Sequence, residues 1–538
     1  MRVPPLDVRI EGSMPLERLR SSTFRLAQSG FRRALFVYAL AGSVHVGSSV
    51  ALLFWFGVLA APPTSSPLTK LACYGGVAWS WSMITMIALA LFWGPDRQIR
   101  RYLALGYVAV LLAMGEVLQL AGAPTLSLSD VTLMTGAERA FLLSFVSALI
   151  GDRVSGDAVA FSPAVQPILF WGLARSPILI PVIAFNRLVR GTVGPLFITI
   201  GLMMTVVTLG SMNLFSNSPG LWLLGRIKGM LHGSVPGTVA AVAVIGLTLS
   251  AALAWLGLRW TAERYRRART SDQLFLFDAL WLSVSGFVSV YLNYDFHPFR
   301  YLLGLLPFAL YRLVVGFGLK PIAVSRGGVP AARLLFLRVF GSSSRSERLF
   351  DLLAARWRYA GSIQLISAMD VARGRFEPDE FLDFINGRLG GAYIDSGRDL
   401  DDRLARLDAR PDPDGRYRVN EFFCRSDTWQ ETVTRLMATS DLLVMDLRAF
   451  TSDRRGAIFE LGTLLDEMPL SRVALLVDRT TDEPLLRRTL AELWKSVAPQ
   501  SPNIAATPRI RIIDLASGYP AVVSRLMQLG DRVLLPAA

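Results

Sequence analysis

Apolar residues are arranged in two different ways along this chain, and the arrangement changes near residue 330. Before it, apolar stretches recur with about the 20 residues that a helix needs to cross a bilayer. An eighth crossing is predicted within Ala160–Ile183, whereas Leu133–Ile150 is predicted to be interfacial or re-entrant because it contains Glu138 and Arg139. The seven clear predicted spans are Ala34–Ala61, Leu71–Trp93, Tyr102–Leu120, Val193–Phe215, Gly237–Leu258, Leu274–Leu292 and Tyr301–Leu319.

After residue 330, short apolar runs alternate with amphipathic helices. Two short helices, Arg333–Phe340 and Leu349–Tyr359, are predicted to lead away from the membrane. The alternation that follows predicts an α/β doubly wound, flavodoxin-like fold with a five-stranded, mostly parallel sheet. The five predicted strands are Ser362–Ala368, Tyr417–Cys424, Asp441–Leu447, Val473–Val477 and Ile510–Leu515. The predicted helices are Pro378–Leu389, Thr428–Thr439, Ala457–Met468, Glu483–Val497 and Ala521–Leu529, and Asp395–Gly415 is a polar insert.

The pattern divides the chain into four parts. Residues 1–33 form a basic cytoplasmic N-terminus, and residues 34–320 form an all-α multi-pass transmembrane domain of about eight helices. Residues 321–360 form amphipathic linker helices, and residues 361–538 form the cytosolic α/β domain. Ligands of doubly wound folds bind beyond the carboxyl ends of the strands, where the strand order reverses. The predicted site therefore lies in the loops after the first and third predicted strands, Met369–Glu377 and Arg448–Arg455.

Net charge separates the same two halves. Residues 1–329 contain 27 Lys and Arg against 13 Asp and Glu, a net charge of +14, whereas residues 330–538 contain 29 of each. Basic loops beside apolar spans are typical of the cytoplasmic side of a membrane protein, and this split does not favour a nucleic-acid surface. The arginine clusters beside the spans all fall on one side if a single crossing lies between Leu120 and Val193. We therefore predict eight spans in the plasma (inner) membrane, with both termini cytoplasmic.

Residue types exclude several kinds of site. Cys73 and Cys424 lie far apart in the sequence, so neither a disulfide scaffold nor a cysteine-based zinc site is predicted. Cys424 lies in an apolar strand and is interpreted as a core residue. All three histidines precede residue 330, so the second half has no histidine base and no histidine-ligated metal. It also lacks the GxxxxGK[ST], GxGxxG and HExxH motifs, and no cofactor is predicted.

Polar side chains inside the predicted spans raise a transport alternative. An ionisable group at membrane depth is costly and is by default a functional candidate. Asp278 and Arg312, on successive spans, are also placed to pair with each other. No inverted repeat of the transporter kind is evident. The five side chains concerned are His45, Glu116, Arg175, Asp278 and Arg312.

One segment of the second half, Ser440–Glu467, combines a buried strand, a polar loop and a helix. The strand ends at Asp446, and Glu460 lies in a G-x-x-x-E-x-G sequence that runs from Gly456 to Gly462. This segment resembles nucleoside 2-deoxyribosyltransferases, in which the glutamate of such a helix acts at the ribose anomeric carbon. It also resembles Toll/interleukin-receptor (TIR) domains, whose NAD-cleaving members keep a glutamate on the helix after the third strand. The resemblance covers about Gly361 to Pro536, and the membrane half shares nothing with either family.

The resemblance implies roles for particular residues. Glu460 would stabilise the positive charge that builds on a ribose when an N-glycosidic bond breaks, or attack it. Asp446 would orient a ribose hydroxyl. Phosphates would meet arginines at the helix start, where backbone N–H groups also point. On a helical wheel Glu460 flanks the apolar stripe, so a favourable interaction with the helix dipole is the alternative interpretation. The residues of this predicted ligand site are Asp370, Arg448, Ser452, Arg454, Arg455 and Gly456.

Three functions stay open from the sequence. The first is a membrane-anchored enzyme of signalling or defence that cleaves NAD or another nucleotide at the cytoplasmic face. The second is a non-catalytic sensor or relay protein whose α/β domain binds a nucleotide or a partner domain. The third is a transporter with a regulatory α/β domain. The bilayer and a nucleotide are the expected partners, a homo-oligomer stays open, and nucleic acid is not expected.

Overall fold

A computed structural model describes most of the second half of the chain and parts of the first. The described residues are 6–11, 22–56, 67, 218–232, 235–292, 298–324, 332–338, 344–368, 382, 384–385, 387, 393–407, 410–425, 427–504 and 508–534. They fall into two compact units. The first comprises Met1–Phe36, Arg259–Asp272 and Gly318–Ala538, and the second comprises Val37–Leu258 and Gln273–Phe317. The predicted spans between Leu71 and Phe215, the helix Leu133–Ile150, Glu116 and Arg175 lie outside the described residues.

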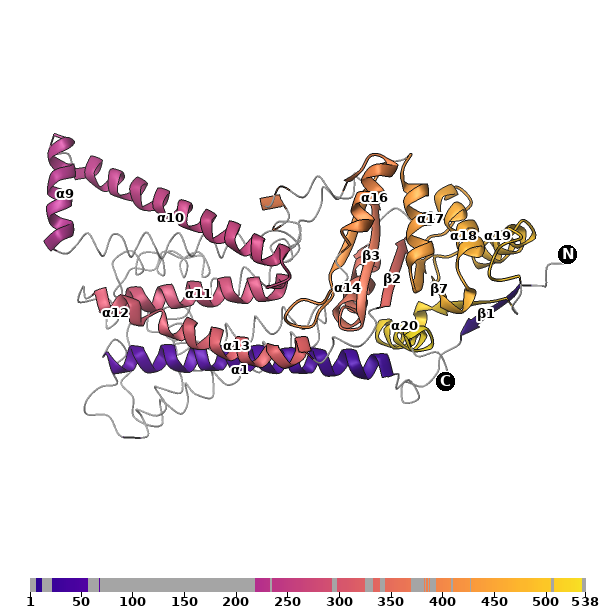
Figure 1. Cartoon of the computed structure of the whole chain (residues 1–538), viewed down its shortest axis with the longest axis horizontal. Coiled ribbons are helices and arrows are strands. Elements are labelled where there is room, and N and C mark those ends of the chain that lie inside the picture. The colour runs from indigo at the N-terminus through magenta and orange to yellow at the C-terminus, as the bar shows by residue number, and fades with distance from the viewer. Residues whose placement is uncertain are drawn as a thin grey trace, which may run out of the picture. The chain divides into compact units, whose positions relative to one another are not determined.

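Helices occupy the described residues at four of the predicted spans (Figure 1). Two stretches, Ser29–Trp55 and Val244–Arg266, are long and apolar enough to cross a membrane by length and composition. The helices are α1 (Ser22–Trp55), α9 (Ser218–Met230), α10 (Val235–Arg266), α11 (Asp272–Leu292), α12 (Pro298–Leu303) and α13 (Leu306–Val324).

Two groups of polar side chains in the second unit contact each other across neighbouring helices. Arg312 Nη1 donates to both carboxylate oxygens of Asp278 at 2.9 and 2.7 Å, so the predicted pairing of these residues is confirmed. The fully buried His45 side chain places Nε2 2.8 Å from the Ser285 hydroxyl and 3.1 Å from the Trp281 carbonyl oxygen. These contacts join α1, α11 and α13, and buried polar groups with partners of this kind stabilise helix packing.

The first unit is built on one parallel sheet of eight strands. The five predicted strands are all present, as β3, β5, β6, β7 and β8. β6 and β7 are short, continuous apolar runs that are buried at every position, as expected for strands covered on both faces. The order across the sheet is β1-β8-β7-β6-β2-β3-β5-β4. The strands are β1 (Asp7–Glu11), β2 (Ala332–Arg338), β3 (Gly361–Ala368), β4 (Tyr393–Ile394), β5 (Val419–Cys424), β6 (Leu442–Asp446), β7 (Val473–Val477) and β8 (Arg509–Asp514).

The predicted helix Arg333–Phe340 is wrong, because Ala332–Arg338 is the central strand β2. Four consecutive residues of β2, from Leu334 to Leu337, are buried, as expected for a strand covered on both faces. β2 pairs with β3 on one side and β6 on the other. Gly361 starts β3 so close to β2 that an added Cβ would lie 1.9 Å from the Ala332 carbonyl oxygen. The sheet therefore begins before residue 361, within the predicted linker.

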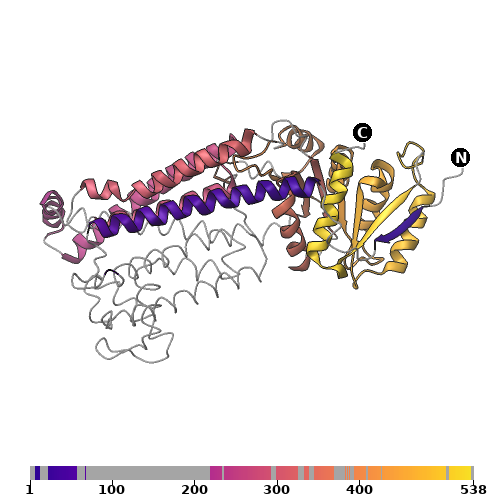
Figure 2. The same ribbon diagram turned by 90° about the horizontal axis from the view of Figure 1, so that it is seen from below.

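Two further strands lie at the edges of the sheet. β1, from the predicted basic N-terminus, pairs in parallel with β8, as the indigo strand in Figure 2 shows. The two-residue strand β4 extends the opposite edge beside β5. With β1 and β4 set aside, six strands remain in the order β8-β7-β6-β2-β3-β5. This is the doubly wound order 3-2-1-4-5-6, so the predicted five-stranded, flavodoxin-like order is wrong, and the strand order reverses between β2 and β6.

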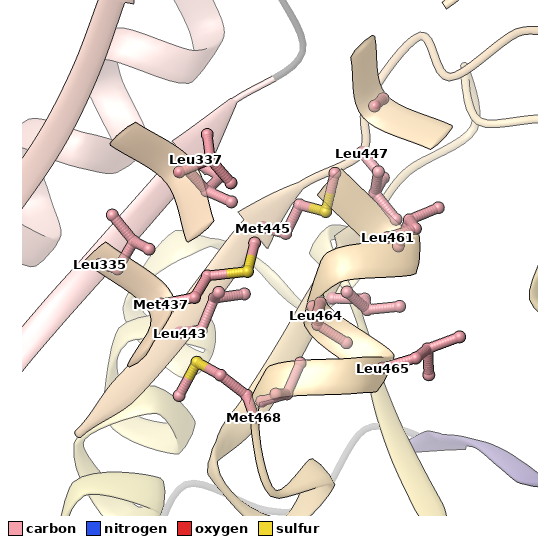
Figure 3. Packing of buried hydrophobic residues seen from close by; sticks show 14 of the residues in the cluster. Leu335, Leu337, Met437, Leu443, Met445, Leu447, Leu461, Leu464, Leu465 and Met468 are labelled. Atoms are coloured by element: carbon pink, nitrogen blue, oxygen red, sulfur yellow. The ribbon is translucent and has the colours of Figure 1, made fainter. Parts of the chain in front are cut away.

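Helices cover both faces of the sheet. α17 (Trp429–Thr439), α18 (Arg455–Glu467) and α19 (Glu483–Lys495) pack side by side, while α14 (Ser344–Trp357) packs against α20 (Tyr519–Leu534). Figure 3 shows Leu461 and Leu464 of α18 facing Leu443 and Met445 of β6. Helix α16 (Gly397–Ala405) lies in the predicted polar insert. Short 3₁₀ turns at Leu470–Arg472 and Leu515–Ser517 precede β7 and α20.

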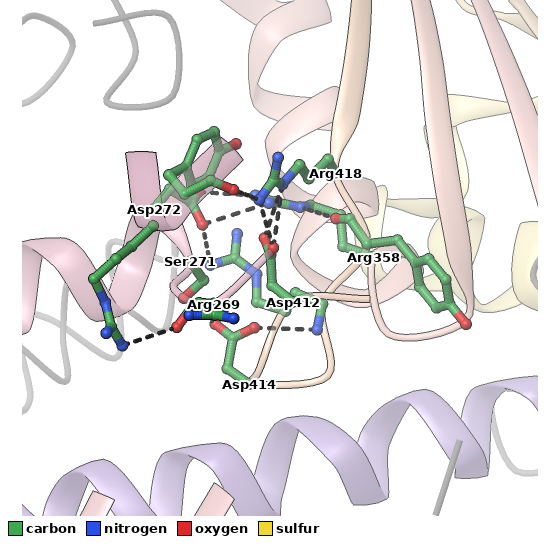
Figure 4. Close-up of polar contacts among 11 residues, drawn as sticks. Arg269, Ser271, Asp272, Arg358, Asp412, Asp414 and Arg418 are labelled. Atoms are coloured by element: carbon green, nitrogen blue, oxygen red, sulfur yellow. Dashed lines mark hydrogen bonds and ion pairs between the residues drawn. The ribbon is translucent and has the colours of Figure 1, made fainter. Parts of the chain in front are cut away.

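A buried ionic network lies at the amino-terminal ends of β3 and β5 (Figure 4). It joins the turn that follows α10 to Arg358, just before β3, and to the loop before β5. Arg358 Nη1 donates to Asp272 Oδ2 at 3.1 Å, and the Ser271 hydroxyl donates to Asp414 Oδ2 at 2.8 Å. The network therefore fixes the α10–α11 turn to the α/β domain within the first unit.

Candidate functional site

The helix predicted to carry the catalytic glutamate, α18, follows β6, which is one of the two central strands of the sheet. β6 ends at Asp446, a loop of eight residues follows, and α18 begins at Arg455. Because the strand order reverses beside β6, this loop lies at the edge where doubly wound folds bind ligands. The other predicted site loop, Met369–Glu377 after β3, lies outside the described residues. β2 separates β3 from β6, so the strand next to β6 at the reversal is β2.

Glu460 is buried in the face of α18 that packs against the sheet. Its side chain is 3% exposed and shares that face with Ala457, Leu461 and Leu464. The predicted position at the flank of the apolar stripe is therefore wrong. No residue that the structure describes gives the Glu460 carboxyl a hydrogen bond or an ion pair. Burial raises the pKa of Glu460 to about 8, so the carboxyl group is mostly protonated at neutral pH.

Asp446 is also buried, but it has a partner. Arg448 Nη2 lies 2.5 Å from Asp446 Oδ2, and Arg448 Nε donates to Oδ1 at 2.8 Å. Both side chains are less than 8% exposed. Arg448 also donates to the Tyr519 hydroxyl at 3.3 Å, at the start of α20. A bidentate pair of this kind holds the loop after β6 in place, and it occupies the carboxylate that was predicted to orient a ribose.

The loop after β6 is held against the loop after β7. Ala449 has a φ of 55°, a left-handed conformation that is uncommon for alanine. Its N–H donates to the Thr480 hydroxyl at 3.1 Å, and the Thr481 hydroxyl donates to the Leu447 carbonyl oxygen at 3.1 Å. Strained backbone of this kind persists only where surrounding contacts determine it, and such residues cluster at functional sites.

The other predicted ligand residues lie at the start of α18. Ser452 and Arg455 are exposed, and Arg454 is half-buried. Gly456 lies against the ring of Trp429, because an added Cβ would be 3.7 Å from Trp429 Cη2. These residues are close in the chain to Asp446 and Glu460, and they lie at a helix N-terminus, which favours anions. Asp370, the remaining predicted ligand residue, lies outside the described residues.

The structure adds aromatic residues that the sequence analysis did not select. Trp429, the first residue of α17, packs edge-on against Phe459 with ring centroids 5.2 Å apart. Tyr519 contacts Arg448, and the Arg348 guanidinium lies 5.7 Å from the Tyr519 ring centroid. The sequence signal for both was weak, because each is a lone aromatic residue at a helix start, where an apolar side chain commonly packs on the core.

The predicted core position of Cys424 is confirmed. Cys424 is buried, and burial raises the pKa of its thiol, so it stays protonated at neutral pH. Among the described residues, no group of three or more His, Cys, Asp or Glu side chains is arranged to hold a metal ion.

No known protein family matches this sequence, and no curated protein or solved structure gives a significant match to the chain.

Proposed function

We propose that this chain is a multi-pass protein of the inner membrane whose cytosolic α/β domain binds a nucleotide and cleaves its N-glycosidic bond with Glu460. The observation that carries the proposal is the buried Glu460 carboxyl, with its pKa near 8, on the helix that follows β6. Buried ionisable groups with strongly shifted pKa values concentrate at functional sites. The resemblance to deoxyribosyltransferases and NAD-cleaving TIR domains supports NAD or a related nucleotide as the substrate class.

The burial of Glu460 suits this reaction. When the bond between ribose C1′ and the base breaks, the base departs with the bonding electrons and positive charge develops on the ribose. Water then adds to C1′ and loses a proton, which completes the hydrolysis. A carboxylate beside the ribose stabilises the charge that develops there more strongly than it stabilises the ground state, in which the ribose itself is uncharged. Because the resting carboxyl group is mostly protonated at pH 7, it must lose its proton to solvent before it can act. Turnover is therefore expected to rise as the pH increases toward 8.

Release of a base tests the proposal in the full-length protein. Purified protein is incubated with NAD, nucleoside monophosphates and nucleoside triphosphates, and free base is measured by chromatography. Glu460→Gln should lower turnover by at least about a hundredfold, the scale of losing one preorganised charge-stabilising group. Glu467→Gln is the matched control, because Glu467 is exposed on the same helix. Equal turnover in the Glu460 variant and the control would contradict the proposed role.

A second candidate function is a non-catalytic relay, and the ionic network favours it. The α10–α11 turn is held to the α/β domain through Asp272 and Ser271, so a movement of these helices would reach β3 and β5 directly. Under this function the wild-type protein binds a nucleotide but releases no base. Equilibrium binding of the same nucleotides, measured beside the chromatography, separates the two functions.

A further inference from the structure

We propose that the exposed face of Arg259–Arg269, at the end of α10, binds the headgroups of anionic phospholipids. The inference rests on the membrane part of the proposed function and is independent of the chemistry at Glu460. This stretch of 11 residues contains five arginines and one acid, Glu263, so its net charge is 5 − 1 = +4.

One face of the segment is committed to the α/β domain. Tyr265 is 3% exposed, and the Arg418 guanidinium lies 3.7 Å from its ring centroid while Arg418 Nη2 donates to the Tyr265 carbonyl oxygen at 2.5 Å. Ala262 is fully buried on the same side. The Ser271 and Asp272 contacts then continue this face through the turn (Figure 4). These contacts fix the rotation of the segment about the axis of α10.

The opposite face is basic and exposed. Arg259, Arg266, Arg267 and Arg269 are exposed, and Trp260 is 63% exposed. The Arg264 guanidinium lies 4.7 Å from the Trp260 ring centroid, so a cation and an aromatic ring form one surface. Trp beside Arg at the end of an apolar helix is typical of the membrane–water interface.

The acid on this surface does not neutralise it. Arg266 Nε donates to Glu263 at 2.6 Å and Arg267 Nε donates to it at 2.8 Å, so a single carboxylate is shared by two guanidinium groups. Arg259 and Arg269 add two more charges, and their exposure leaves them available to solvent or lipid.

The rest of α10 favours a lipid as the occupant. Leu249, Leu253 and Leu256 are each more than 55% exposed on this helix. The candidate span Val244–Arg266 runs directly into the basic segment. An apolar helix that ends in exposed Trp and Arg matches acyl chains followed by anionic headgroups, and basic residues near such a surface each contribute to binding. A free phosphate would match the arginines but not the tryptophan and the leucines.

Lipid binding to the full-length protein tests the inference. Delipidated protein in non-ionic detergent is titrated with phosphatidylglycerol or phosphatidylcholine, and intact protein–lipid complexes are counted by mass spectrometry. Wild-type protein should retain phosphatidylglycerol at least about tenfold more tightly than phosphatidylcholine. The triple variant Arg259→Gln/Arg264→Gln/Arg267→Gln should lose most of this preference, since each basic residue near an anionic surface contributes severalfold.

A control with the same change in charge separates a local surface from net charge. Arg398, Arg479 and Arg488 are exposed on the α/β domain, and their triple substitution by glutamine should leave the lipid preference unchanged. Both variants should keep the melting temperature of the wild-type protein, because all six side chains lie outside the buried network. Equal loss in the two variants, or a wild-type protein without preference for phosphatidylglycerol, would overturn the inference. Neither result depends on whether any nucleotide is cleaved.

Discussion

Glu460 combines two properties that seldom occur together, full burial and an ionisable carboxyl group without a partner among the described residues. Burying a charge without a compensating hydrogen bond is costly, so such a group becomes neutral instead. Buried groups with strongly shifted pKa values concentrate at functional sites. The residue-scale evidence therefore favours a role for the carboxyl group itself, which an isosteric amide tests directly.

The pH dependence of stability provides that test without any substrate. The pKa of Glu460 is raised in the folded state, so its contribution to stability is complete below the unfolded pKa near 4.5 and is lost as pH rises through about 8. Glu460→Gln removes this dependence. At pH 5 the variant should be no more stable than wild type. At pH 9 the free energy of unfolding of the variant should exceed that of wild type by on the order of a few kcal/mol.

Urea unfolding of both proteins between pH 5 and pH 9 measures the difference. Burial also raises the pKa of Asp412 and Asp414, so the wild-type curve alone contains more than one group. Subtracting the variant curve from the wild-type curve removes their contributions. A difference that stays constant with pH would show that Glu460 keeps an ordinary pKa in the folded protein.

At the scale of elements, the sheet depends on β2, a strand that the sequence pattern predicted as a helix. β2 carries Arg333 and Arg338 at its ends around a run of leucine and phenylalanine, a composition that suits an amphipathic helix as well as a strand. Its central position, between β3 and β6, means that a fragment without it exposes both neighbours. Unpaired strands of this kind aggregate.

Two fragments test the position of β2. The fragment 330–538 contains β2 and should give a cooperative melt with mixed α/β circular dichroism. The fragment 345–538 lacks it and should not, because the two halves of the sheet are then no longer paired with each other. Circular dichroism melts and size-exclusion chromatography check both. A cooperative, monomeric 345–538 fragment would contradict the central placement.

Two of the strands that the sequence predicted, β6 and β7, have a simpler signal. Each is an unbroken apolar run that is buried at every position, so there is no alternation to misinterpret. β1 and the ionic network were not predictable in this way, since both depend on contacts between distant parts of the chain. Ser271 and Asp414 are 143 residues apart, and nothing local in the polar loop before β5 distinguishes a buried carboxylate from a solvated one.

The network itself predicts a large local effect. Asp272 contacts the guanidinium groups of Arg358 and Arg416, and all three side chains are less than 15% exposed. Asp272→Asn would leave these buried cations with less compensation, which commonly costs about 3–5 kcal/mol when a partner is removed. Hydrogen exchange of the full-length protein should become faster in the turn after α10 and at the start of β3.

The matched control for that exchange experiment is Asp402→Asn. Asp402 pairs with Arg406 at 3.7 Å on the surface, where both side chains are more than 60% exposed, so its loss should have almost no effect. Exchange that is equally fast in both variants would indicate that the network contributes no more than a surface pair.

At the scale of the whole molecule, the contacts within the first unit bear on membrane topology. The α10–α11 turn contacts the α/β domain through Asp272, and Phe31, near the start of α1, packs on Tyr359 with ring centroids 6.0 Å apart. The N-terminal segment, the turn and the C-terminal domain must therefore lie on one side of any membrane that the helices cross. The arginine clusters predict that this side is the cytoplasmic one.

The loop between α11 and α13 supplies the decisive measurement. α11 leaves the turn at Asp272 with 21 residues, about 30 Å of helix and enough to cross a bilayer, and α13 returns to the chain that enters β2. A reporter inserted after Arg267 should therefore be cytoplasmic, and one after Asp295 should be on the other side. Impermeant labelling of single cysteines at the two positions measures this in intact cells. Labelling on the same side at both positions would rule out α11 and α13 as a pair of crossings, and with it the predicted count of eight spans.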